Sequence, residues 1–353
     1  MMAYKVIQWA TGSMGKSCLR ATIDHPDLDL VGLLVYSESK VGRDAGEIAR
    51  RDPTGVIATR SVDDIMAIEA DVVIHAPRIQ PPYSYHNKDI CRLLASGKNV
   101  ISINGHSFPQ HWGPAYIKDF QTACAKGGTT LFGTGLNPGF LIEKITTVAT
   151  GICTRIDNIY VGEIFDCRTV PNANYVFDVL GFGADPAKLG LNDASWAPAE
   201  LMTGMYAEVV AQLVDRLGLQ LDHVEPDHFV QPASEDLHVT AGVVKKGTVA
   251  VTNWRWHGIV DGTRFVTLSI SWIMEDTWLE DKSYNHWEVK IRGLPGIDIS
   301  MNLIEPENTE FKTKAEQYAV AGSVINSIPA VCAAAPGVMQ IPVFAPYRPR
   351  FTD

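Results

Sequence analysis

The chain has 353 residues, a length that suits two domains better than a single core. Its hydrophobic content of 46% and charged content of 20% are typical of a soluble globular protein. Its net charge of −10 argues against a nucleic-acid or anionic-membrane surface as the main partner. We find no stretch of the roughly 20 apolar residues that a membrane helix needs, and the N-terminus is predicted to be a strand rather than a signal peptide.

The six cysteines are scattered along the chain, with no CxxC pair and no spacing typical of a metal site. We therefore expect reduced thiols, no bound metal and a cytoplasmic location. A small-molecule substrate fits this composition better than a nucleic acid or a membrane.

The N-terminal segment MMAYKVIQWATGSMGK predicts a strand, a tight turn and the start of a helix. Such a turn places the pyrophosphate of a dinucleotide on backbone N–H groups at the helix N-terminus. Gly12 would let the backbone approach the phosphates, and Gly15 would let helix and strand pack closely. Ala10 stands at the first glycine of the G-x-G-x-x-G fingerprint of dinucleotide-binding turns, so the match is incomplete. A tight turn without a ligand is the alternative. The predicted contacts are Thr11, Gly12, Ser13, Met14 and Gly15.

Strands and helices alternate over the first 150 residues, which predicts a parallel sheet covered on both faces. Helices are predicted at 83–96 and 114–126. The predicted strands are 4–10, 28–36, 71–76, 98–103 and 129–133. Ligands of such a sheet bind at the carboxyl ends of its strands, so the residues that follow each strand are the candidates for a site.

Cofactor choice depends on the end of the second strand, because a carboxylate there selects NAD by binding the adenosine ribose. Ser37 stands in that place, and Lys40 and Arg43 follow it. A hydroxyl and two cations suit a 2′-phosphate, so we predict NADP. Glu38 could still serve NAD, and a solvated loop without a ligand is the other alternative.

The ends of the later strands are predicted to surround the nicotinamide ring. These are the backbone turns at Ala76-Pro77, at Asn104-Gly105 and at Asn137-Pro138-Gly139. The Asn137 side chain could hold the carboxamide through its paired donor and acceptor.

From about residue 156 the pattern changes to β-rich segments, with one helix at Ala197–Leu217. The predicted strands are Asp157–Asp166, Asp227–Gln231, Leu237–Val244, Thr248–Trp256, Arg264–Met274 and Trp287–Ile291. They indicate an α+β substrate domain with a mainly antiparallel sheet. A last helix at Lys314–Ala334 is rich in small residues and is expected to return to the first domain. The predicted organisation is a Rossmann domain over 1–150, a substrate domain over 151–310 and a returning segment over 311–353.

Several motifs resemble one family. VGLLVYSESKVGRDAGE, Val31 to Glu47, resembles the second strand and following loop of dihydrodipicolinate reductase-like proteins. INSIPAVCAAAPGV, Ile325 to Val338, is similar to the C-terminal segment of the branch that contains 2,4-diaminopentanoate dehydrogenase and the native amine dehydrogenases. The resemblance implies a Rossmann domain, an α+β substrate domain and NAD(P)H-linked chemistry at a C–N centre.

One departure from that branch concerns the residue that acts on the amine. The resemblance implies an acidic residue just after the fourth strand, but this chain has Asn104, Gly105 and His106 there. His106, or a water held by Asn104, would then move the proton, and an imidazole suits neutral pH. Glu163, on a predicted strand of the second domain, is the next candidate.

Three functions remain open at this point. The first is an amine dehydrogenase that interconverts a small ketone or aldehyde, with ammonia, and an amine. The second is an NAD(P)H-dependent reductase of a C=N, C=C or C=O bond, which the missing carboxylate favours. The third, from another class, is a non-catalytic dinucleotide-binding sensor. We expect a homodimer.

Overall fold

The structure, a computed structural model, describes residues 3–189, 197–277, 286–307 and 313–350. The chain divides into two compact units. Unit 1 consists of Met1–Phe140 and Ile304–Pro342, and unit 2 consists of Leu141–Leu303 and Val343–Asp353. Among the described residues, no helix is long and apolar enough to cross a membrane.

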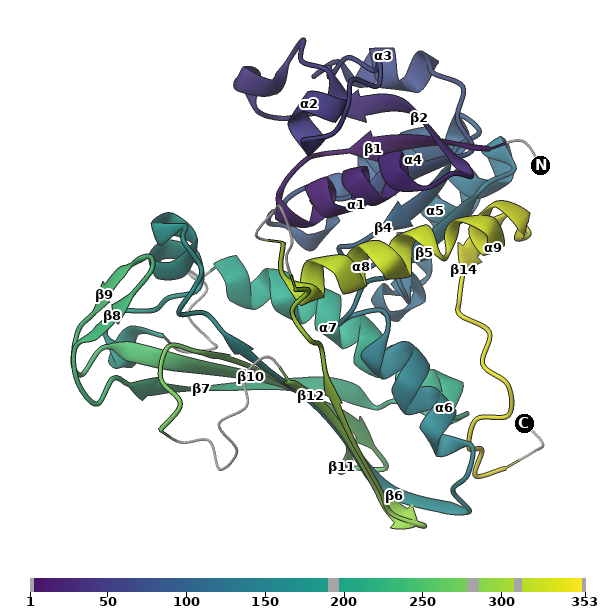
Figure 1. The fold of residues 1–353 in the computed structure, drawn as a ribbon. Helices are drawn as coiled ribbons and strands as arrows, with labels where there is room; N and C mark the ends of the chain where they lie inside the picture. The colour runs from purple at the N-terminus through teal and green to yellow at the C-terminus, as the bar shows by residue number, and fades with distance from the viewer. Residues whose placement is uncertain (1–2, 190–196, 278–285, 308–312, 351–353) are drawn as a thin grey trace. The chain divides into compact units, whose positions relative to one another are not determined.

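Unit 1 is built on a six-stranded parallel sheet with the strand order β14-β5-β4-β3-β1-β2 (Figure 1). Its strands are β1 (Tyr4–Trp9), β2 (Leu28–Leu34), β3 (Val72–His75), β4 (Asn99–Ser102), β5 (Thr130–Gly133) and β14 (Gly337–Met339). The first five confirm the predicted strands. The chain runs from β1 to β2 on one side and then crosses to β3 on the other, so the order reverses at β1, where parallel sheets bind ligands.

Helices cover both faces of this sheet because its strands are apolar on both sides. Ile7, Val73 and Val100 face α3, α4 and α5, while Val6 and Val72 face α1, α8 and α9. The helices are α1 (Ser13–Asp24), α2 (Ala45–Ala49), α3 (Val62–Ala67), α4 (Asn87–Ala95), α5 (Pro114–Gly127), α8 (Ala315–Ile325) and α9 (Ile328–Ala333). Short 3-10 turns are η1 (Glu38–Lys40), η2 (Tyr83–His86) and η3 (Pro109–Trp112).

Two predicted helices differ from the structure. The segment 83–96 begins with the 3-10 turn η2 and becomes α-helical only at Asn87. The segment 314–334 is divided into α8 and α9, because Pro329 has no backbone N–H to continue a helix and instead occupies the first turn of α9. The strand β14, which extends the sheet beside β5, is absent from the predicted strands.

Unit 2 contains a six-stranded sheet with the order β13-β12-β6-β11-β10-β7. All neighbouring strands are antiparallel except β6 and β11. The strands are β6 (Arg155–Asp166), β7 (His223–Pro232), β10 (Val249–Val260), β11 (Thr263–Ile273), β12 (His286–Leu294) and β13 (Ile297–Asn302). The long helix α7 (Ala197–Arg216) packs on β7, β10 and β11, as Figure 1 shows. Shorter helical segments are η4 (Leu141–Thr146), α6 (Thr147–Thr150), η5 (Asn174–Val179) and η6 (Pro186–Lys188).

The single strand predicted at Leu237–Val244 is wrong. The structure has a hairpin there, β8 (Leu237–Val239) and β9 (Gly242–Val244), which forms a separate two-stranded sheet. The turn between them depends on Gly242, whose φ of 148° a side chain would disfavour. The predicted α/β class, with a parallel Rossmann sheet and a mainly antiparallel second sheet, is confirmed.

Candidate dinucleotide and catalytic site

The turn between β1 and α1 has a left-handed backbone at Ala10, with a φ of 75°. This is where the fingerprint's first glycine stands, and such a φ costs a residue with a Cβ about 1 kcal/mol or more. The buried Gln8 side chain supports the turn, since its Nε2 donates to the Ala10 carbonyl oxygen at 2.9 Å. The backbone geometry of the fingerprint is therefore kept although its glycine is not.

Gly12 and Gly15 have different roles in this turn. A Cβ on Gly15 would collide with the carbonyl oxygen of Ala10, so this glycine is needed for the close packing of α1 on β1. A Cβ on Gly12 would meet nothing within 4 Å, so this position faces open space at the N-terminus of α1. That N-terminus has no side-chain cap and no acidic residue in its first turn. The turn thus fits a pyrophosphate, which would accept hydrogen bonds from the N–H groups of the first helical turn.

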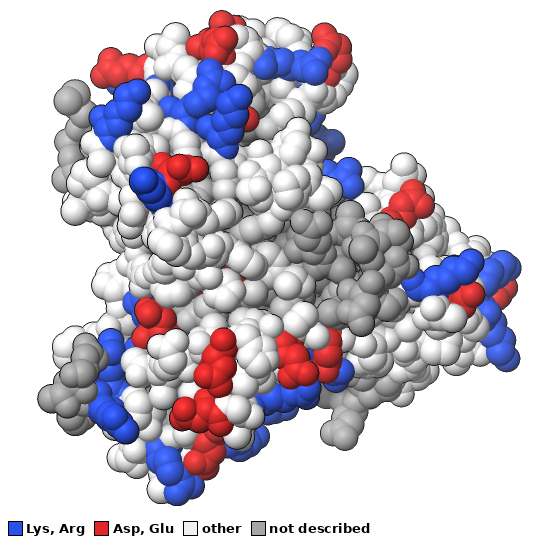
Figure 2. Space-filling view, turned by 180° about the vertical axis from the view of Figure 1, so that it is seen from behind, with Lys and Arg blue, Asp and Glu red and all other residues white. Residues whose placement is uncertain are grey.

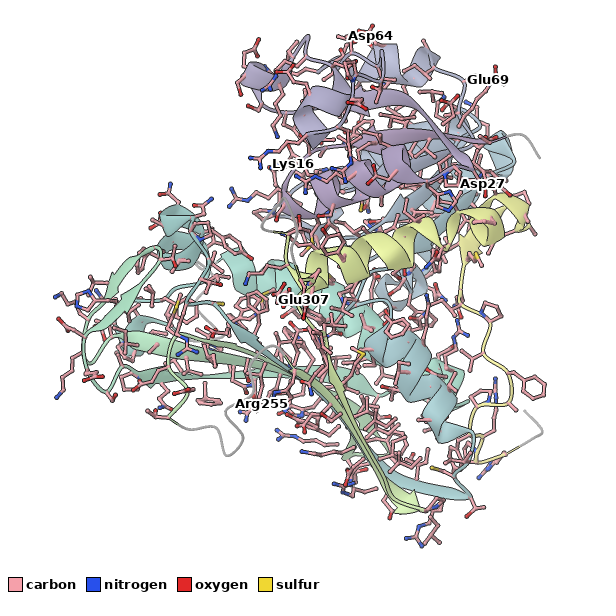
Figure 3. All side chains as sticks on the ribbon, in the orientation of Figure 1. Lys16, Asp27, Asp64, Glu69, Arg255 and Glu307 are labelled. Carbon is pink, nitrogen blue, oxygen red and sulfur yellow. The ribbon has the colours of Figure 1, made fainter. Side chains whose placement is uncertain are left out.

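Two lysines lie at this helix end. Figure 3 shows Lys16 at the start of α1. Lys40, from η1, donates from Nζ to the Thr11 carbonyl oxygen at 2.9 Å and to Thr11 Oγ1 at 2.8 Å. Partial burial lowers the pKa of each lysine, and neighbouring cations lower it further. Arg20 and Arg50 act on Lys16 in this way, while Lys16 and Arg43 act on Lys40. These positive charges repel one another, and a bound anion would relieve the repulsion.

The other predicted residues at the end of β2 have their own partners. Arg43 donates from Nη2 to Glu47 Oε1 at 2.6 Å, and Glu38 forms an ion pair with Arg60. The Ser37 and Ser39 hydroxyls are 2.9 Å apart. Of the residues predicted to hold a 2′-phosphate, Lys40 therefore has the most direct geometric link to the glycine turn.

The Asp44 carboxylate organises the loop that carries these side chains. It accepts hydrogen bonds from the backbone N–H groups of Gly46 at 2.7 Å, Thr54 at 3.0 Å and Gly55 at 2.7 Å. These bonds, that of Thr54 first, lower the pKa of Asp44. The Asp44-Ala45-Gly46-Glu47 motif thus fixes the loop whose Lys40 contacts the glycine turn.

The ends of β3 and β4 are tied together. Asn104 donates from Nδ2 to the Pro77 carbonyl oxygen at 2.7 Å, and the Ala76 N–H donates to the Trp9 carbonyl oxygen at 3.0 Å. Gly105 and His106 both have a positive φ, 88° and 65°, so the loop turns sharply after β4. The predicted contacts Ala76, Pro77, Asn104 and Gly105 consequently lie at one part of the sheet edge.

The structure buries His106 and gives both of its ring nitrogens a partner. Nδ1 lies 3.0 Å from Ser102 Oγ, and Nε2 lies 3.1 Å from Asn87 Oδ1. The residue is 2% exposed, and burial lowers its pKa to about 4. His106 is therefore a neutral imidazole at physiological pH, held in one orientation.

The turn containing Asn137 closes the same edge beyond β5. The N–H of Phe140 donates to the Leu136 carbonyl oxygen at 3.0 Å. A Cβ on Gly139, whose φ is 125°, would collide with the backbone of Gly135. This tight backbone holds Asn137 at the end of the sheet.

Glu163 lies in unit 2, on the face of its sheet that packs on α7. Its Oε2 accepts a hydrogen bond from Trp287 Nε1 at 2.7 Å. Trp256 is on the same face and donates from Nε1 to Thr203 of α7 at 3.2 Å. Burial raises the pKa of Tyr206 well above its usual value, and Glu163 raises it further, so this neighbour stays a neutral phenol. A carboxylate among aromatic rings can bind a cationic amine or hold a proton.

Sequence reasoning missed several residues of the edge. Tyr83 carries no signal in the sequence, yet its hydroxyl accepts from the His106 N–H at 3.2 Å. Gln317, from α8 near the other end of the chain, donates to the Ser13 hydroxyl of the glycine turn. Within the described ranges, no group of three or more His, Cys, Asp or Glu could hold a metal.

Comparison with known proteins agrees with this geometry. Residues 6–101 match the family model of the dihydrodipicolinate reductase N-terminus. An amine dehydrogenase from Streptomyces virginiae is 26% identical over 359 residues, which cover 97% of this chain and 96% of the relative. A 2,4-diaminopentanoate dehydrogenase from Acetoanaerobium sticklandii is 22% identical, covering 85% of this chain and 84% of the relative.

A solved amine dehydrogenase from Mycobacterium smegmatis has the same fold. Its TM-score is 0.77 with 18% identity, and the match covers 99% of this chain and 98% of that chain. The resemblance predicted from the sequence motifs is therefore confirmed, both at the N-terminal segment and along nearly the whole chain.

Proposed function

We propose that this protein is an NAD(P)-dependent oxidoreductase of the amine dehydrogenase type, which interconverts a small ketone or aldehyde, with ammonia, and an amine. The observation that carries the proposal is similarity to an amine dehydrogenase over 97% of the chain. The glycine turn with its open helix end supports it. A nicotinamide cofactor supplies the hydride when bound, so the protein's own residues must bind, orient and move a proton.

The glycine turn is assigned to the pyrophosphate, and we propose NADP as the cofactor. Lys40 supports this choice, because it follows β2 and its ammonium is fixed against Thr11 of the turn after β1, with further cations nearby. Glu38 is the alternative determinant for NAD, but its ion pair with Arg60 engages its carboxylate.

Two side chains are proposed for the proton, and their surroundings rank them. Glu163 has its carboxylate oriented by one indole N–H. His106 is neutral and bonded at both nitrogens, so a proton transfer there must displace Ser102 or Asn87. We therefore propose Glu163 as the main acid–base group, and His106 with Asn104 as the residues that hold the loop after β4.

The functional test is cofactor oxidation with a panel of small ketones and aldehydes, with and without ammonium. Turnover that requires ammonium supports amine dehydrogenation, and turnover without it identifies a reductase of a C=O or C=C bond. Binding of NADPH without any turnover would identify the non-catalytic sensor.

The same assay separates the two proton candidates. Glu163→Gln keeps an acceptor for Trp287 but removes the charge, and should lower kcat roughly 10²-fold. His106→Ala should then have a smaller effect on kcat. If His106→Ala lowers kcat by about 10²-fold and Glu163→Gln leaves it unchanged, the ranking is wrong.

We propose that a second copy of the chain binds the sheet face of unit 2 opposite α7. Small polar residues, Asn253, Ser269 and Ser271, lie nearly buried at its centre. The partly exposed ion pairs Asp227–Arg255 and Glu288–Lys290 around them would make the contacts. Figure 3 labels Arg255 on this sheet. Six strands about 4.8 Å apart and on average about ten residues long present about 800 Å² per copy, the usual size of a stable interface when two copies meet. Sedimentation of Ser269→Arg, which should shift the protein to a monomer, tests this.

The partner chemistry otherwise favours small molecules. In Figure 2, described basic side chains lie next to acidic ones on the side of the molecule that is drawn. All six cysteines are free thiols, and burial raises the pKa of each, Cys18 to about 12. Unpaired thiols together with a nicotinamide cofactor support the cytoplasm as the proposed location.

A further inference from the structure

Five aromatic side chains contact one another in series at the edge formed by the ends of β1, β2 and β3. Trp9 donates from Nε1 to the Tyr36 hydroxyl at 2.9 Å. The ring centroids are 5.7 Å apart for Trp9 and His75, 5.4 Å for His75 and His86, and 4.9 Å for His86 and Tyr85. We call this series, Tyr36, Trp9, His75, His86 and Tyr85, the aromatic ladder.

The two ends of the ladder are exposed although its interior is buried. Tyr36 is 50% exposed and Tyr85 is 54% exposed, whereas Trp9 and His75 are fully buried. Burial raises the pKa of Tyr36, and Asp89 and Tyr85 raise it further. The contacts from Tyr36 through Trp9, His75 and His86 to Tyr85 place both tyrosines at the same edge of the sheet. Two fixed aromatic faces are thus presented to solvent beside the cofactor turn.

The middle of the ladder acts as a rigid support. His75 has no hydrogen-bond partner for either ring nitrogen within the described residues, and burial lowers its pKa well below the usual value. It therefore serves as a neutral ring packed between Trp9 and His86, and His86 is anchored by the Arg78 carbonyl oxygen, 2.9 Å from its Nε2. Such contacts fix the directions of the two terminal tyrosines.

We propose that Tyr36 and Tyr85 form the stacking site for the adenine ring of the dinucleotide. The inference rests on the proposed function, because the pyrophosphate must lie on the Gly12–Gly15 turn after β1. The adenosine half then extends toward the end of β2, where Tyr36 directly precedes Ser37 and Lys40 follows. A purine presents a π face that aromatic side chains stack on without reading its hydrogen-bonding edge. Adenine affinity would then depend on flat rings at positions 36 and 85.

The test measures binding by calorimetry with two halves of the cofactor, ADP-ribose and reduced nicotinamide mononucleotide. Tyr36→Leu and Tyr85→Leu keep apolar volume but remove the flat face, and each should weaken ADP-ribose binding roughly tenfold. Tyr85→Phe should bind ADP-ribose as the native protein does. Phe344→Leu removes an exposed ring of unit 2 (96% exposed) and serves as the matched control. The mononucleotide should bind all variants equally.

The outcomes separate this inference from the proposed function. If the native protein binds neither ADP-ribose nor NADPH, the proposed function itself fails. If the native protein binds ADP-ribose and the leucine variants bind it as tightly, the adenine site is elsewhere while the function stands. Equal losses for ADP-ribose and the mononucleotide would mean that the tyrosines only hold the edge together, which also overturns the inference.

Discussion

The two halves of the carboxyl edge of the unit 1 sheet differ in charge. At β1 and β2, an uncapped helix end meets Lys16 and Lys40, whose positive charges repel one another. At β3 and β4, the buried histidines are His75, His86 and His106, and burial lowers the pKa of each. The first half is suited to phosphates, and the second, whose buried imidazoles add no charge, is suited to the nicotinamide ring.

The largest expected effect is on the free energy of unfolding at low pH, and it tests the half of the edge at β3 and β4. His106 is fully buried with a pKa of about 4, while the unfolded chain has the ordinary value near 6.5. The unfolded state therefore binds more protons between these values, and the stabilisation present above pH 6.5 is lost as the pH falls toward 4. The loss should be about 3 kcal/mol from this residue alone.

Urea unfolding followed by tryptophan fluorescence between about pH 7 and pH 4.5 measures this loss. His106→Asn should reduce the pH dependence without abolishing it, because the buried His75 adds to it in the same direction. Asparagine tolerates the positive φ at this position. The control His223→Gln changes an exposed histidine of unit 2 and should keep the native slope. An unchanged slope in His106→Asn would show that other groups cause the acid sensitivity.

The next effect is on cofactor affinity, and it tests the half of the edge at β1 and β2 by a substitution in the glycine turn. Gly12→Val places a side chain in the open space at the helix end, which would obstruct the pyrophosphate and weaken cofactor binding at least roughly tenfold. The protein should still fold, because a Cβ at this position meets no neighbour within 4 Å. Titration of NADPH by fluorescence measures the affinity. A folded Gly12→Val variant with native affinity would place the cofactor elsewhere.

The strands of the two sheets show which elements a sequence pattern can predict. Apolar runs followed by Gly or polar turns predict five strands of the parallel sheet correctly, because a buried parallel strand is apolar on both faces. The short strand Gly337–Met339 follows Pro336 and has too few residues to show a period. The hairpin of β8 and β9 resembles one strand in the sequence because both of its arms have the same apolar character.

The site residues also divide into those that the sequence can predict and those that it cannot. The glycine turn can be predicted because its geometry depends on the backbone, which glycine positions reveal. The contacts of Trp9 with Tyr36 and of His75 with His86 join residues from different strand ends, and only the folded chain brings them together. Single residues that follow strands can be proposed from sequence, but their pairing cannot.

A smaller effect tests which cation recognises the cofactor. Lys40→Ala should weaken NADPH binding by about tenfold and NADH binding far less, if its ammonium binds a 2′-phosphate. Arg43→Ala is the comparison, and its effect should be smaller because Glu47 already pairs with Arg43 at 2.6 Å. Equal losses of both cofactors in Lys40→Ala would assign Lys40 to the support of Thr11 alone, and a native preference for NADH would overturn the NADP proposal.

The smallest effect concerns Ala10, the position where the turn departs from the glycine fingerprint. Its φ of 75° is unfavourable for a residue with a Cβ, so Ala10→Gly should relieve about 1 kcal/mol of strain in the folded state. Glycine also loses more backbone entropy on folding, which offsets part of this gain. Thermal unfolding should therefore show a small rise in Tm, with unchanged NADPH affinity because the N–H groups of the turn keep their directions.

The control is Ala21→Gly within α1, which should lower Tm because glycine destabilises a helix interior. A fall in Tm for Ala10→Gly, similar to that of Ala21→Gly, would show that the alanine is held at this φ without strain.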